Sequence, residues 1–385
     1  MQKVNYRQWI GTIIFITTFL YGPSKKGMVY SKMKYSGVIA LAFVLAVIAE
    51  GFVGAGSAFV SQAHASGSCI QYGAFGKSVS YIEAVNQGYF AKEGVSVCYN
   101  QVTSSTQQIN SLLSGQYDII SSTADNVVNQ DVNNNQSIQV IAGIDQGANL
   151  DLVVNTNLGI NSIHDLEGKA ILVDAPNSGF VIALEKIMAE NGMYLNQDYT
   201  LNSVGGSKIR YQDMVAGQTS TGDPAYATML AAPYIEQARA VSYLSDIASL
   251  STYTEPYQGT SIALTQSYGQ RNTDTVDRFL TAMIMGSMYA ANSNNQSAVI
   301  ADIANADGVS TQIAANIYAD TEQNTATGEN VNEQVNQQGL VNTINLRQEF
   351  GGFNTTVDST QLAQPGPNAI YNDQYWQEAY QDLQN

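Results

Sequence analysis

Short apolar runs alternate, from residue 68 onward, with stretches whose apolar positions repeat every three or four residues. The β-type runs lie at 68–73, 95–99, 117–122, 138–145, 150–154 and 170–173. Helical stripes lie between and after them, for example over 181–188, and again at 275–289 and 310–318. This alternation favours an α/β architecture with parallel sheets over an all-β fold or a helical bundle.

The loops that join these strands to the next helix are small and polar. Gly73–Ser78, Thr103–Thr106 and Ser122–Asp125 follow the first three strands, and Pro176–Phe180 follows the strand at 170–173. Hydroxyl side chains in such loops suit helix N-caps. In open α/β sheets ligands bind at the carboxyl ends of the strands, so we expect these loops to face a binding site.

Charge is distributed unevenly along the chain. Six of the 16 Lys and Arg residues precede residue 66, where Glu50 is the one acid, so residues 66–385 carry a formal charge of −21. The apolar run 37–49 follows two lysines, and Ala63-His-Ala65 places small residues where a signal peptidase cleaves. We predict a secretory signal in residues 1–65, cleaved after Ala65, with Met28 or Met33 as an alternative start. An uncleaved membrane anchor is the other interpretation.

Two cysteines, Cys69 and Cys98, lie in the first two strands of the part that would be exported. The two strands enclose a helical stretch and so form a βαβ unit, whose consecutive strands commonly lie side by side. In an oxidising compartment we therefore expect a disulfide between them, worth roughly 3–4 kcal/mol by loop entropy. Two buried thiols are the alternative.

Only 12% of the residues are charged, whereas about 25% is usual. The net charge of −16 excludes a nucleic-acid binder that works through a basic surface, and 44% hydrophobic residues argue against disorder. Asn and Gln replace charge in stretches such as 129–135, 292–296 and 330–338. We expect a domain adapted to an acidic exterior. Carboxyl pKa values lie at about 4, so at pH 3–4 much of the excess negative charge and its self-repulsion would be lost. We therefore expect the domain to stay folded and to bind its ligand at pH 3–4.

Five segments, in this order, resemble the substrate-binding proteins of ABC importers, in the nitrate, sulfonate, taurine and thiamine-pyrimidine-precursor group. They are Gln87–Gly94, Leu113–Asp118, Asp165–Lys169, Val173–Gly179 and Ala232–Ala238. The resemblance implies a periplasmic-binding-protein type II-like α/β fold, with two lobes around a central cleft and two hinge crossings near 145–150 and 257–260. It implies lobe one, first part, at 66–147, lobe two at 148–257, and a return segment with C-terminal helices at 258–385.

The same resemblance implies a function. A periplasmic monomer would capture a small molecule by lobe closure and deliver it to an ABC permease at the inner membrane, with no cofactor. We expect a small anion, either an organic sulfonate or carboxylate or a nitrate-like ion, because helix N-termini and loop N–H groups suit anions. A neutral heteroaromatic, such as a thiamine pyrimidine precursor, is the alternative.

The candidate ligand-binding residues lie in the loops that would face this cleft. Lys77 on lobe one and Arg210 on lobe two are the cations expected to hold an anion. Phe75 and Phe180 are the aromatic residues that we expect to stack on a planar ligand. The full set is Phe75, Gly76, Lys77, Ser78, Thr103, Ser104, Ser122, Thr123, Asp125, Asn177, Ser178, Gly179, Phe180, Gly206, Arg210 and Asp223. Each hydroxyl residue has an ordinary helix cap as its alternative role, and Asp223 comes later than the family pattern places it.

Two other classes of function remain open. Enzymes share this fold, but the pyrimidine synthases among them use a Cys-rich iron motif and an active histidine, and neither is visible here. His164 lies in what reads as a surface turn, and no nucleophile elbow, phosphate loop or metal-ligand spacing occurs, so we predict neither catalysis nor a metal site. A sensory module could use the same fold, but it would need an output domain on another chain.

Overall fold

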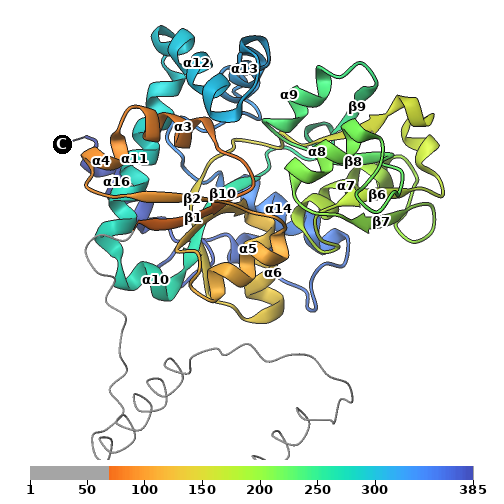
Figure 1. Ribbon diagram of the computed structural model, residues 1–385. Coiled ribbons are helices and arrows are strands. Elements are labelled where there is room, and N and C mark those ends of the chain that lie inside the picture. Colours follow the sequence, from red (N-terminus) through yellow and green to blue (C-terminus); the bar gives the residue numbers. More distant parts are fainter. Residues whose placement is uncertain (1–68, 385) are drawn as a thin grey trace, which may run out of the picture. The chain divides into compact units, whose positions relative to one another are not determined.

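The computed structural model describes residues 69–384, which contain two five-stranded sheets with helices around them (Figure 1). We call the sheet of β1–β4 and β10 with its helices lobe one, and the sheet of β5–β9 with its helices lobe two. The predicted signal segment, 1–65, lies outside the described residues. Within residues 69–384, no helix is both long enough and apolar enough to cross a bilayer.

Lobe one has the strand order β2-β1-β3-β10-β4. Its strands are β1 (Ile70–Ala74), β2 (Val97–Gln101), β3 (Ile119–Thr123), β4 (Ile138–Gly143) and β10 (Thr260–Thr265). β1 pairs in parallel with β2 and β3, and β10 lies antiparallel between β3 and β4. Separate apolar clusters cover the two faces, so every residue of β4 is buried.

Lobe two repeats this plan with the order β7-β6-β8-β5-β9. Its strands are β5 (Asp151–Asn155), β6 (Ala170–Val173), β7 (Thr200–Ser203), β8 (Ala227–Leu230) and β9 (Leu244–Ser249). β6 pairs in parallel with β7 and β8, and β5 lies antiparallel between β8 and β9. The two-lobed α/β fold class is therefore confirmed.

The prediction of purely parallel sheets is wrong for one strand in each lobe. The chain passes from β4 to β5 and returns from β9 to β10, and these entering strands are the antiparallel ones. Thr260, at the start of β10, pairs with Thr123, at the end of β3. A strand that enters from the other lobe begins at the edge where the parallel strands end, so it must run in the opposite direction.

Helices follow most of the strands, and several begin where hydroxyl caps were expected. The side chains of Ser78, Ser104 and Thr123 accept hydrogen bonds from backbone N–H groups at the starts of α3, α5 and α6. The helices up to β9 are α3 (Val79–Asn86), α4 (Tyr89–Lys92), α5 (Ser105–Leu113), α6 (Ala124–Asn134), α7 (Gly179–Glu190), α8 (Ser207–Ala216) and α9 (Tyr234–Arg239). The helical stretch that we predicted between the first two strands consists of two helices, α3 and α4, because Gly88 adopts φ +71° between them.

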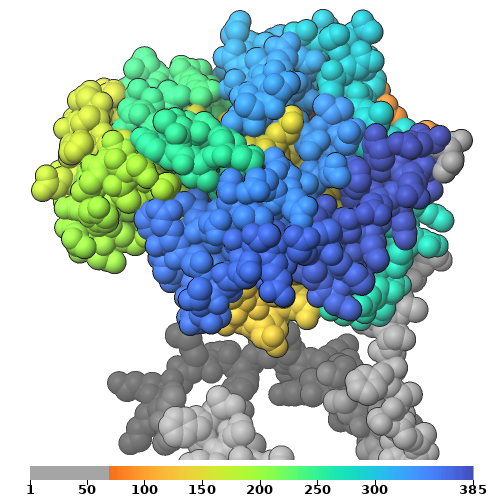
Figure 2. Space-filling view, turned by 180° about the vertical axis from the view of Figure 1, so that it is seen from behind, coloured from red at the N-terminus to blue at the C-terminus, as the bar shows by residue number. Residues whose placement is uncertain are grey.

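The C-terminal third packs back on lobe one and covers the rear of that lobe (Figure 2). Its helices are α10 (Gln266–Arg271), α11 (Thr273–Ala291), α12 (Gln296–Asp307), α13 (Thr311–Tyr318), α14 (Gln337–Glu349), α15 (Ser359–Leu362) and α16 (Gln374–Asp382). The long α11 crosses α3 closely at Gly286, where a Cβ atom would lie 2.1 Å from the Ser80 carbonyl oxygen. Only glycine allows this helix contact.

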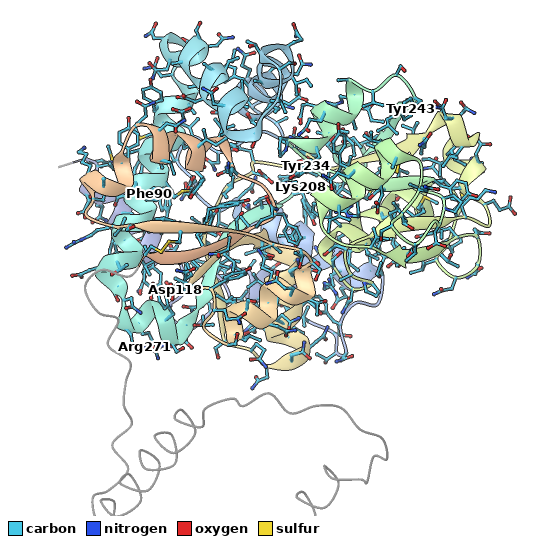
Figure 3. All side chains as sticks on the ribbon, in the orientation of Figure 1. Phe90, Asp118, Lys208, Tyr234, Tyr243 and Arg271 are labelled. Atoms are coloured by element: carbon cyan, nitrogen blue, oxygen red, sulfur yellow. A yellow bond between two sulfur atoms is a disulfide. The ribbon has the colours of Figure 1, made fainter. Side chains whose placement is uncertain are left out.

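The predicted disulfide is present between Cys69 and Cys98, whose Cα atoms are 5.5 Å apart. Cys98 lies in β2 opposite Gln71 of β1, and Cys69 directly precedes β1. The bond appears as a yellow stick in lobe one (Figure 3). The βαβ argument from the sequence is confirmed, because adjacent parallel strands bring the two residues together.

Most of the buried side-chain oxygens without a hydrogen-bond partner in the described part belong to carboxyl groups. These acids are Glu83, Glu236, Asp277, Glu322 and Glu333. Burial raises their pKa values to between about 7 and about 9, and neighbouring carboxylates contribute to the shift. A carboxyl group without a donor is tolerated in the interior when it is protonated, so the fold retains protons at mildly acidic pH.

Candidate functional site

A cavity of about 110 Å³ lies between the two lobes. Lobe one lines it with the β1–α3 loop, the end of β3 and the start of β10. Lobe two contributes Phe180, Ser207 and the segment Ala231–Tyr234, and the C-terminal third adds Asp307 and Glu329. Figure 3 labels Tyr234 where lobe two meets the β1–α3 segment. The strand ends therefore meet at a cavity lined by both lobes.

Seven of the predicted site residues line this cavity. They are Phe75, Gly76, Lys77, Ser78, Ser122, Thr123 and Phe180. Thr103, Ser104, Asp125, Asn177, Ser178, Gly179, Gly206, Arg210 and Asp223 do not line it. Most members of this second group instead hold the lobes together or support the cavity wall from behind.

Lys77 reaches the cavity, but its ammonium group is bound to the protein. The Nζ atom donates to the Ala306 carbonyl oxygen at 2.7 Å and lies 5.8 Å from the centre of the Tyr99 ring. Burial raises the pKa of Asp307 to about 6, although the nearby Lys77 opposes this shift. The cation expected to hold an anionic ligand is thus partly neutralised within the wall.

Glu329 occupies the N-terminus of α3, the helix that follows the first strand. Its two carboxylate oxygens accept hydrogen bonds from the backbone N–H groups of Val79 and Ser80, at 2.7 and 3.0 Å. A helix N-terminus attracts negative charge through its free N–H groups and the helix dipole. The protein's own carboxylate therefore fills the position where we expected an anionic ligand.

Asp145 lines the same cavity at the point where the chain leaves lobe one. One of its carboxylate oxygens accepts from the Thr260 N–H at 2.9 Å, and a β-bridge joins Asp145 to Glu329. Burial raises the pKa of Asp145 to about 6, although hydrogen bonds with Thr260 oppose this shift. Two carboxyl groups thus share one wall of the cavity.

The lobes are joined by hydrogen bonds across the cleft. Ser105 N–H donates to the Asp174 carboxylate at 2.9 Å, Gly206 N–H donates to the Thr103 carbonyl at 2.7 Å, and Gly179 N–H donates to the Asn126 side-chain oxygen at 2.9 Å. Asp174 also accepts from the Ser178 hydroxyl at 2.8 Å. The starts of α5 and α7 are thus satisfied by the opposite lobe, and the structure represents a closed arrangement.

Arg347 of α14 forms a buried link between the lobes. Its guanidinium donates to both oxygens of Asp125, at 2.8 and 2.5 Å, and to the side-chain and backbone oxygens of Asn177, at 2.8 and 3.1 Å. The side chains of Arg347 and Asp125 are 0% and 1% exposed. Asp125 and Asn177 therefore hold a lobe-to-lobe contact instead of facing the cavity.

Arg210 lies behind the wall of the cavity and is almost completely buried. It donates to Ser207, Thr228 and backbone carbonyls, and its guanidinium carbon lies 5.5 Å from the centre of the Phe180 ring. Ser207 and Phe180 both line the cavity. Arg210 is thus placed to position two lining residues and does not itself line the cavity.

Two glycines permit the close approach of the lobes. A Cβ atom on Gly206 would lie 3.0 Å from the Phe75 ring, and one on Gly76 would lie 3.3 Å from Pro233. Asp223, in contrast, accepts from the Thr221 hydroxyl at 2.7 Å in a turn outside the cavity lining. Within residues 69–384, no group of three or more His, Cys, Asp or Glu residues is arranged to hold a metal ion.

The predicted set of site residues lacks Glu329, Asp145, Arg347 and Tyr234. Tyr234 could have been found, because it lies in the segment Ala232–Ala238 that carries the family resemblance. Glu329 had none, because it lies far along the chain in a stretch of Asn, Thr and Gly and reaches α3 only through the tertiary fold.

One protein family has a sequence model that matches this chain. The sequence model of the family described as NMT1/THI5 like matches residues 77–297, more than half of the chain. No curated protein sequence matches the chain.

Solved structures share the fold at low sequence identity. A protein of Bordetella bronchiseptica RB50 superposes with a TM-score of 0.68 and 14% identity, covering 83% of this chain and 99% of the other. The periplasmic nitrate-binding protein NrtA from Synechocystis PCC 6803 gives 0.65 and 11%, covering 82% and 89%. The alkanesulfonate-binding protein SsuA from Xanthomonas axonopodis pv. citri, bound to MOPS, gives 0.61 and 11%, covering 78% and 96%.

Proposed function

The chain belongs to the NMT1/THI5-like family and has the periplasmic-binding-protein fold, and from this premise we propose that it is an exported solute-binding protein of an ABC importer. It captures one small organic molecule between its lobes and delivers it, as a monomer, to a membrane permease. The observation that carries the proposal is the cavity closed from both sides, with Phe75 on one lobe and Phe180 on the other.

The closed arrangement supports capture by lobe movement. Three hydrogen bonds join the lobes, between Ser105 and Asp174, between Gly179 and Asn126, and between Gly206 and Thr103. A ligand that touches both lobes stabilises the closed form by its differential affinity for that form, and this shifts the population of the two forms. A permease that recognises the closed form would then distinguish loaded from empty protein.

The cavity favours the heteroaromatic alternative over the expected anion. NrtA binds nitrate and SsuA binds alkanesulfonates, which supports an anion by analogy alone. In this chain Glu329 fills the α3 N-terminus, whereas Phe75, Phe180 and Tyr234 provide aromatic walls. Aromatic rings stack on flat ligands at modest entropic cost, so we propose a small flat organic ligand.

Mass spectrometry of material released by denaturing the purified protein tests the proposal. We expect one small molecule in stoichiometric amount, which on re-addition gives saturable thermal stabilisation without being converted. Phe180→Ala should weaken this stabilisation. Phe353 packs at the edge of the lobe-one core, so Phe353→Ala should leave the stabilisation by ligand unchanged. Conversion of the molecule by purified protein would support the enzyme alternative, and absence of any saturable ligand would refute the binding function.

A further inference from the structure

The side chains that line the cavity carry more negative than positive charge. Three acids, Asp145, Asp307 and Glu329, line it against one cation, Lys77. Lys77 already donates to Ala306 and lies close enough to Asp307 to oppose the rise that burial causes in the pKa of that acid. Lys208, labelled beside the cleft in Figure 3, is exposed and lies outside the lining. The wall therefore offers carboxylates without a free cation to balance them.

The N-terminus of α3, the position best suited to an anion, is already occupied by a carboxylate of the protein. Both oxygens of Glu329 take the first N–H groups of α3. An anionic ligand there would have to displace Glu329 and leave its carboxylate buried without donors, which is costly. A ligand that leaves Glu329 in place meets the outer edge of a carboxylate, which accepts hydrogen bonds and attracts positive charge.

Further carboxyl groups lie behind this wall. Glu333 is 1% exposed and neither of its oxygens has a hydrogen-bond partner. Glu83 and Glu322 each leave one buried oxygen without a partner, and Glu322 senses the charges of Glu329, Glu83 and Glu333. Among the described residues, none of the ion pairs involves any of these four glutamates. Burial favours the protonated form of Glu83, Glu322 and Glu333, so the acids that would meet a positive group are those that line the cavity.

We propose, on the basis of the binding function above, that the ligand carries a positive charge on nitrogen, as an ammonium group or a protonated ring amine. The charged nitrogen lies against Asp145 and Glu329, and the flat part of the ligand lies among Phe75, Phe180 and Tyr234. Aromatic faces attract cations as well as flat rings, so both parts of the wall select the same class of molecule. Organic anions and nitrate are rejected by like charge.

Three probes that differ mainly in charge test this inference: protonated 4-aminopyridine, neutral isonicotinamide and anionic isonicotinate. Calorimetric titration at pH 7.5 measures their affinity for the whole exported protein after bound material has been removed. We expect the aminopyridinium to bind at least tenfold more tightly than isonicotinate, since a charge-assisted hydrogen bond contributes roughly 1.5–3 kcal/mol. Tighter binding of isonicotinate, or binding of none of the three, would overturn the inference.

Charge-neutralising variants locate the effect. Glu329→Gln and, independently, Asp145→Asn should each reduce affinity for the aminopyridinium tenfold or more and reduce the preference over isonicotinate. Glu167→Gln, which removes the same charge from an exposed position, should change neither value. Unchanged preference in both cavity variants would overturn the inference. The released-ligand experiment remains separate, because an anion found there would refute the charge assignment and leave the binding function intact.

Discussion

A substitution of Arg347 tests most directly how the lobes are held together. Replacing this residue by Met keeps an unbranched apolar chain in place of the aliphatic part of Arg347 and removes all donors. Asp125, 1% exposed, would lose the two hydrogen bonds at 2.8 and 2.5 Å that now neutralise it, and the Asn177 oxygens would lose theirs. Breaking a buried ion pair from one side costs about 3–5 kcal/mol, because the remaining charge stays in the interior without compensation.

That cost is large enough to measure by thermal and chemical unfolding. For a domain of this size, 1 kcal/mol corresponds to roughly 2 °C, so Arg347→Met should lower the melting temperature by about 6–10 °C. Asp125→Asn combined with Arg347→Met should recover part of the loss, because the uncompensated charge is then absent. A double-mutant cycle would give the coupling energy between the two residues.

A partly exposed set of ion pairs supplies the comparison. Lys186 of α7, 14% exposed, pairs with Glu190 at 2.8 Å and with Glu349 of α14 at 3.0 Å. These two carboxylates are 45% and 51% exposed, so each pair contributes about 0–1 kcal/mol. Lys186→Met should therefore change stability little. If Arg347→Met proved as mild as Lys186→Met, or if the cycle showed no coupling with Asp125, the assignment of Arg347 as a lobe-to-lobe link would be wrong.

Three further predictions concern stability. Replacing Cys69 and Cys98 together by Ser should cost roughly 3–4 kcal/mol in denaturant unfolding, and reductant should then have no further effect. Gly286→Ala should cost about 1–3 kcal/mol by overpacking α11 against α3, seen as a lower melting temperature, whereas Met288→Ala, 46% exposed on the same helix, should be nearly neutral. The buried carboxyls have raised pKa values in the folded state, from about 7 to about 9, so the folded protein binds more protons and stability falls as pH rises from about 5 to 8. A melting temperature that rises over this range would contradict the assignment.

The fold followed from local signals to a large extent. Alternating apolar runs located the strands, and hydroxyl caps at Ser78, Ser104 and Thr123 located helix starts. The direction of β5 and β10 did not follow, because a short apolar run has the same pattern in parallel and antiparallel pairing. It is set by where the chain enters each lobe, which depends on the tertiary path.

The sequence indicated which loops lie at the cavity, but it did not indicate the partners of their side chains. Loops at strand ends do reach the cavity, as Phe75, Ser122 and Phe180 show. The partner of each side chain depends on residues far away in the sequence: Lys77 is bound by Ala306, 229 residues on, and α3 is capped by Glu329, 250 residues after Val79. No spacing rule connects such pairs, so the loop residues alone could not give the charge of the site.

Helix N-termini and loop N–H groups led to the expectation of an anionic ligand, whereas the acids that line the cavity favour a cationic one. A net charge of −21 over residues 66–385 describes the whole chain, and at low pH its repulsion of an anion would fade. The charged side chains that line the cavity are Asp145, Asp307, Glu329 and the already engaged Lys77. Burial raises the pKa of Asp145 and Asp307 to about 6 and that of Glu329 to about 7. Protonating these groups removes attraction for a cation, so affinity should fall with acid while stability rises. Opposite pH slopes for binding and unfolding therefore separate a cation site from the anion site that the loops at the helix N-termini suggested, because an anion site would gain affinity and stability together as the pH falls.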